Sequence, residues 1–175
     1  GCAVMSDEMA SEYADRYNAR CVVLRTPIHL SQHPIRRMAR HPTDPLRLVL
    51  AGNTYADDAW KALLAALDAS DWHVGGRQLI LRVLSPDLVL YGRRSVWVEY
   101  LGWRSPAEAL GLMAEADAAY IPYWFEGAYA EVSRLCFPSK LTAYLLAGLP
   151  ILYHGPAGTA VSGFMTKWPL GVSCN

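Results

Sequence analysis

Lys140 follows Ser139 at the start of a predicted helix, which places a cation where a protein can bind an anion. Ser139 is predicted to cap a helix over 140–147, and Gly148 is predicted to end it. The first turn of a helix offers unpaired N–H groups and the positive end of the dipole, and both favour an anion. Lys140 adds a full positive charge in that turn. The competing interpretation, a solvated helix residue, fits the sequence equally well.

Patterns typical of other chemistries are missing from the sequence. It contains no G-x-x-x-x-G-K-[ST], G-x-G-x-x-G or G-x-S-x-G, so an NTPase, a dinucleotide oxidoreductase and a serine hydrolase are unsupported. It has no H-E-x-x-H and no D-x-D, and the adjacent Asp57 and Asp58 are interpreted as charges at a helix start. The four cysteines are scattered, which argues against a zinc site and a disulfide framework. We therefore expect no metal and no cofactor.

Charge and hydropathy exclude further classes of partner. Sixteen basic residues balance sixteen acidic ones, so the sequence gives no reason to expect nucleic-acid binding. No apolar run is long enough to span a bilayer, and no signal peptide is visible. A basic stretch of Arg36, Arg37, Arg40 and His41 could contact an anionic surface, although a solvated loop is the simpler interpretation. We expect a cytoplasmic protein, with peripheral contact at the inner face of a membrane.

Short apolar runs alternate with helical patterns along most of the chain. Strands are predicted at 46–51, 78–84, 96–101, 118–121, 151–153 and 170–173. Helices are predicted at 57–69, 106–116 and 140–147, and Ser105, Pro106 and Glu108 form a capping box before the second of them. Continuously apolar strands separated by helices predict an α/β domain with a doubly wound, Rossmann-like parallel sheet.

In such a sheet ligands bind at the carboxyl ends of the strands. The corresponding edge comprises 52–54, 102–104, 122–127 and 154–158. We therefore expect a ligand cleft lined by 52–54, 102–104, 122–127 and 138–140.

The first 45 residues do not follow this rhythm. A helix is predicted at 6–17 and a strand at 20–24, followed by a proline-rich stretch. This pattern favours the tail of a preceding domain over 1–26, a linker or long loop over 27–45, and a ligand-binding domain over 46–175 that is truncated at its C-terminal end.

The order of these pieces resembles the carboxyl-terminal domain of GT-B-fold glycosyltransferases of the group 1 type. Four stretches carry the resemblance: 6–27, 47–53, 98–120 and 137–150. The last contains the more specific pattern, P-x-K…Y-x-x-x-G-x-P, from Pro138 to Pro150.

The resemblance implies transfer of a sugar from a nucleoside diphosphate sugar to a polysaccharide, glycolipid or similar acceptor. This chain would be the donor-binding half, inactive alone, and the acceptor, carbohydrate or lipid-linked, would bind through the missing domain. The implied nucleotide and diphosphate contacts are Gly52, Asn53, Trp103, Arg104, Ser139 and Lys140. The implied catalytic residue is Glu126, and the implied sugar contacts are Gly127 and His154.

The sequence departs from the family at the carboxylate pair expected to bind the ribose. Ala143 stands before Tyr144 where the family has a glutamate, and Leu135 stands eight residues earlier. Other groups hold the ribose, or the nucleotide differs, or none is bound. Two alternative functions therefore stay open: a non-catalytic relative that binds a partner, and a sugar-nucleotide epimerase. Trp103 could equally pack at an interface, and His154 could be structural.

Overall fold

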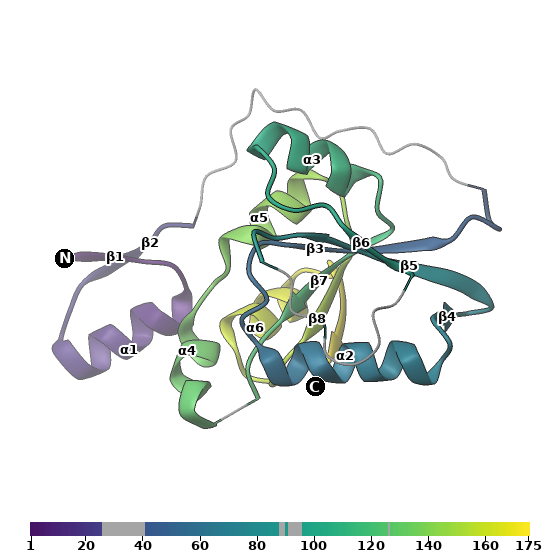
Figure 1. Ribbon diagram of the computed structural model, residues 1–175. Helices are drawn as coiled ribbons and strands as arrows, with labels where there is room; N and C mark the ends of the chain where they lie inside the picture. Colours follow the sequence, from purple (N-terminus) through teal and green to yellow (C-terminus); the bar gives the residue numbers. More distant parts are fainter. Residues whose placement is uncertain (26–40, 88–89, 91–95, 126) are drawn as a thin grey trace.

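The structure, a computed structural model, describes residues 1–25, 41–87, 90, 96–125 and 127–175. Its main body is a sheet with helices on both faces (Figure 1). Six parallel strands form it: β3 (Leu46–Ala51), β5 (Arg77–Leu84), β6 (Val98–Tyr100), β7 (Ala118–Pro122), β8 (Ile151–His154) and β9 (Gly171–Cys174). A short strand, β4 (His73–Val74), pairs antiparallel with the start of β5.

The spatial order of the parallel strands is β6-β5-β3-β7-β8-β9. Numbered along the chain this is 3-2-1-4-5-6, the order of the Rossmann fold. The chain moves outward from β3 on one side, then returns and continues from β7 on the other. The switch point therefore lies between the carboxyl ends of β3 and β7. The predicted fold class is confirmed.

The helices divide between the two faces of this sheet. One face packs on α2 (Asp57–Ala69) through Trp60, Leu64 and Leu67. The other face packs on α3 (Pro106–Ala114), α5 (Ser139–Leu146) and α6 (Ala160–Lys167). Neighbouring strand residues alternate between the two cores, as Leu48 and Val49 do.

The local capping signals explain several helix starts. Ser105 accepts a hydrogen bond from the Glu108 amide, and the Glu108 carboxylate accepts one from the Ser105 amide, so the predicted capping box of α3 is confirmed. Ser139 is not the cap that the sequence predicted. Pro138 occupies the cap position of α5 without a side-chain hydrogen bond, and Ser139 is the first helical residue.

Two segments predicted as loops contain helices. The stretch after β7 holds a 3₁₀ turn, η1 (Gly127–Tyr129), and α4 (Ala130–Leu135). The stretch after β8 holds α6, whose first amides are capped by Thr159 and Ser162. The truncation at the C-terminal end stays a prediction, because α6 precedes β9, the last strand.

A small unit precedes the sheet and lies beside α4 (Figure 1). It consists of β1 (Cys2–Val4), α1 (Asp7–Tyr17) and β2 (Cys21–Val23), and the two strands pair in parallel. Ser6 caps α1 and also donates its hydroxyl proton to the Leu135 carbonyl, 2.6 Å away. The division of the chain at 26 and 45 stays a prediction, because 27–40, with Arg36, Arg37 and Arg40, lie outside the described residues. Among the described helices, none combines the length and hydropathy of a membrane span.

Tyr144 ties α5 to the switch point. Its side chain is fully buried, and its hydroxyl oxygen accepts a hydrogen bond from the Ala51 amide at 2.8 Å. The hydroxyl proton lies within reach of the carbonyl oxygens of Tyr120 at 3.3 Å and Ala51 at 3.4 Å. One hydroxyl thus satisfies backbone groups of both central strands where these strands separate.

Tyr144→Phe should lower the free energy of unfolding by about 1–2 kcal/mol, because the Ala51 amide loses its acceptor inside the protein. Tyr100→Phe is the matched control, since its hydroxyl donates to the Pro86 carbonyl at an exposed site. Denaturant unfolding of both variants tests this. Equal midpoints for the two variants would contradict the role of the Tyr144 hydroxyl.

Candidate functional site

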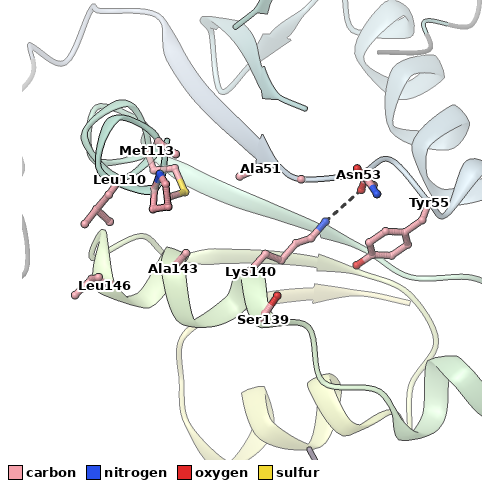
Figure 2. Close-up of a pocket in the computed structure, with 12 residues that line it drawn as sticks. Ala51, Asn53, Tyr55, Leu110, Met113, Ser139, Lys140, Ala143 and Leu146 are labelled. Atoms are coloured by element: carbon pink, nitrogen blue, oxygen red, sulfur yellow. Dashed lines mark hydrogen bonds between the residues drawn. The ribbon is translucent and has the colours of Figure 1, made fainter. Parts of the chain in front are cut away.

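A pocket of about 520 Å³ opens at the carboxyl end of β3, next to the switch point and between α3 and α5 (Figure 2). It lies where an open α/β sheet binds its ligands. The residues that line it are Ala51, Gly52, Asn53, Tyr55, Pro106, Ala109, Leu110, Met113, Ser139, Lys140, Ala143 and Leu146.

The two ends of the pocket differ in polarity. Figure 2 shows Lys140, Asn53 and Tyr55 together at one end. The other end is formed by Leu110, Met113 and Leu146. Ala143 lies on α5 between the two ends. The pocket can therefore bind a ligand that is charged at one end and less polar at the other.

Lys140 is held at the polar end by two contacts. Its ammonium group donates a hydrogen bond to the Asn53 carbonyl at 3.3 Å and lies 4.4 Å from the centre of the Tyr55 ring. No carboxylate of the described residues lies within ion-pair distance of it. Burial lowers the pKa of Lys140 to about 8. An anion bound here would supply the missing counter-charge.

Gly52 leaves room beside this ammonium group. Its φ of +84° is strained for residues other than glycine. A Cβ at this position would lie 3.7 Å from Cε and 3.8 Å from Nζ of Lys140. The Gly52 amide donates to the Leu84 carbonyl at 2.7 Å, which fixes the turn. The turn that ends β3 thus brings backbone close to the lysine while keeping the pocket open.

The structure brings together four of the predicted site residues: Gly52, Asn53, Ser139 and Lys140 all line the pocket. Trp103 and Arg104 are not among the residues that line it. The Trp103 side chain is 70% exposed, and the Arg104 guanidinium donates to the Trp103 carbonyl at 2.9 Å. Of the four segments predicted to line a cleft, 102–104 and the described residues of 122–127 are not among the residues that line this pocket.

The predicted sugar contacts lie elsewhere. The Nδ1 of His154 is 2.8 Å from the hydroxyl of Tyr120, a residue of the α2-side core. That hydroxyl also donates to the Ala59 carbonyl, so both bonds form when Nδ1 carries the proton. Burial lowers the pKa of His154, and the Asp58 carboxylate partly opposes this effect. Gly127 begins η1, and Glu126 lies outside the described residues.

Sequence reasoning missed Tyr55 and the α3 side of the pocket. Tyr55 heads a row of rings: Trp124 lies 4.7 Å from it and Tyr129 a further 5.2 Å away, measured between ring centres. The row joins the loop after β3 to η1 and supports the surface on which Lys140 rests. The aromatic run containing Trp124 was visible in the sequence, but nothing there linked it to Tyr55.

No protein-family model matches the chain, and no curated protein matches its sequence. Among solved structures, the crystal structure of WaaG, described as "a glycosyltransferase involved in lipopolysaccharide biosynthesis", matches with a TM-score of 0.61. The match covers 98% of this chain at 17% sequence identity, and this chain spans 48% of that one. The likeness shows the fold: a Rossmann-like α/β domain of the kind found in a glycosyltransferase.

Lys140 should titrate near pH 8, more than two units below its ordinary value of 10.5. The sequence has three lysines, Lys61, Lys140 and Lys167, so NMR of ¹³C-methylated protein resolves them directly. Lys140→Arg assigns the signal by removing it. A midpoint near 10.5 for that signal would mean that the ammonium group is solvated rather than held in the pocket.

Proposed function

We propose that this chain is the donor-binding half of a glycosyltransferase and binds a nucleoside diphosphate sugar in the pocket between α3 and α5. The observation that carries the proposal is Lys140, a cation without a carboxylate partner among the described residues, placed at the switch point of a Rossmann-like sheet. The likeness in fold to a glycosyltransferase agrees with it. No further cofactor is proposed.

The polar end of the pocket suits the diphosphate. When the sugar leaves, negative charge develops on the departing phosphate oxygen, and a fixed cation stabilises that charge. Lys140 lies in the first turn of α5, whose dipole also favours an anion, and no side chain caps that helix. Gly52 allows a phosphate to approach the backbone beside it. Both groups would act on the same diphosphate.

The apolar end of the pocket suits the base. Leu110, Met113 and Leu146 offer a surface against which a flat aromatic ring can pack. The pocket volume of about 520 Å³ lies within the range typical of small-molecule sites. The nucleoside would then lie along α5 with its phosphates toward Lys140, and the sugar would leave the pocket on the side of Tyr55.

We propose no acceptor site on this chain. Because the chain spans about half of the WaaG chain that it resembles, we propose that a second domain binds a polysaccharide, glycolipid or similar acceptor. We place the reaction in the cytoplasm, at the inner face of a membrane when the acceptor is lipid-linked. Glu126 remains our candidate for the catalytic residue, and Gly127 and His154 remain our candidates for contacts with the transferred sugar.

A second candidate function is supported by Ala143. It lines the pocket at the position where the resemblance led us to expect a carboxylate for the ribose. A relative that kept the fold and lost nucleotide binding would show the same substitution. Nucleotide binding separates the two functions, because a non-catalytic module would bind none.

Lys140→Ala should weaken nucleotide binding about tenfold to a hundredfold, because a hydrogen bond to a charged group contributes about 1.5–3 kcal/mol. A thermal-shift screen of UDP, GDP, ADP and their sugars first identifies the best nucleotide, since ligand at a hundred times Kd stabilises by about 2.7 kcal/mol. Calorimetric titration then compares wild type with the variant. Lys61→Ala on α2 is the control and should bind normally. Equal affinities in all three proteins would contradict the proposal.

The affinity should also depend on pH. Between pH 7 and 9 the free Lys140 loses its proton, so binding of the nucleoside diphosphate should weaken about tenfold over that interval. Lys140→Arg stays charged throughout and should bind with nearly constant affinity. Wild type and Lys140→Arg showing the same pH profile would assign the dependence to another group.

A further inference from the structure

We propose that this pocket binds 2′-deoxyribonucleotides at least as tightly as the corresponding ribonucleotides. The inference rests on the proposed function, because it assumes that a nucleotide lies in the pocket with its diphosphate at Lys140. It concerns the class of nucleotide, which neither the fold nor the charge of the site determines. The observation behind it is the apolar wall that begins at Ala143.

The spacing along α5 places the ribose. Lys140, Ala143 and Leu146 all line the pocket, and they follow one another three residues apart on one face of the helix. Positions with this spacing lie about 5–6 Å apart. The ribose is joined directly to the diphosphate, so a diphosphate at Lys140 leaves the ribose beside Ala143. The base then reaches Leu146.

The opposite wall offers the ribose no polar side chain either. It is formed by Ala109, Leu110 and Met113 of α3. The polar side chains that line the pocket, Asn53, Tyr55, Ser139 and Lys140, gather at the other end (Figure 2). Among the described residues of the lining, none has a carboxylate. A 2′-hydroxyl between these walls therefore has no charged acceptor.

The apolar walls predict which of the two nucleotides binds more tightly, because ribose and 2′-deoxyribose differ by one hydroxyl. A site that hydrogen-bonds a hydroxyl rejects the analogue that lacks it, whereas an apolar wall gives no such advantage. Moving a hydroxyl from water to an apolar wall costs free energy when the hydroxyl finds no hydrogen-bond partner there. The deoxy form should therefore bind equally well or up to about tenfold more tightly.

Calorimetry of the unmodified protein with three matched pairs tests the inference: UDP with dUDP, GDP with dGDP, and ADP with dADP. For each pair that binds, we expect the Kd of the deoxy form to lie between about one tenth and about twice the Kd of the ribo form. A ribonucleotide that binds more than about twofold more tightly than its deoxy partner would overturn the inference and leave the proposed function intact. Failure of every nucleotide to bind would overturn both.

Ala143→Glu should reverse the preference. A carboxylate beside the ribose accepts hydrogen bonds from its hydroxyls, so the variant should favour the ribo form about tenfold. Thr142→Glu adds the same charge at the preceding position of α5, is half-buried like Ala143 but does not line the pocket, and should leave the ratio of the two affinities unchanged. An unchanged ratio in a folded Ala143→Glu protein would show that the ribose lies elsewhere and overturn the inference. If that variant does not melt cooperatively, the matched pairs with unmodified protein decide.

Discussion

Ligands of an open α/β sheet bind where neighbouring strands separate, and here the Tyr144 hydroxyl bridges β3 and β7 at that point. The register joins these strands through Leu48 with Ala118 and Val49 with Ala119, and beyond that point they diverge. The hydroxyl of Tyr144 lies between the Ala51 amide and the Tyr120 carbonyl. Because Tyr144 belongs to α5, this contact also fixes the helix that carries Lys140 to the end of β3.

Lys140 is unfavourable for the fold taken alone. It places a positive charge in the first turn of a helix, where the dipole is already positive, and burial disfavours its charged form. The Asn53 carbonyl and the Tyr55 ring compensate in part, since both present negative potential to the ammonium group. Local choices that conflict with stability concentrate at functional sites. A bound anion would remove this conflict, because its negative charge would balance the charge of Lys140. A lysine that faces solvent would not need such a partner.

Much of the fold could be predicted because its signals are local. The strand at 46–51, the helix at 57–69 and the capping box at Ser105 depend on neighbours in the sequence, and the structure confirms them. The helix after Thr159 was missed because glycines and a proline before it suggested a continuing loop. Tyr55 and the α3 wall were missed for a different reason. Three segments that are distant in the sequence, 51–55, 106–113 and 139–146, form the pocket, and no local pattern shows which of their faces meet.

The effect of having Ala143 in place of a glutamate depends on the side chains that surround it in the pocket. In the sequence, the substitution removes a carboxylate and leaves open whether another group replaces it. The structure shows small and apolar side chains on both walls at that depth, and polar groups confined to the end near Lys140. A pocket of this kind takes most of its affinity from charge at one end and excludes ligands at the other by shape. In the orientation that we propose for a nucleotide, this pocket would distinguish ligands by the size of the base better than by the hydroxyls of the sugar.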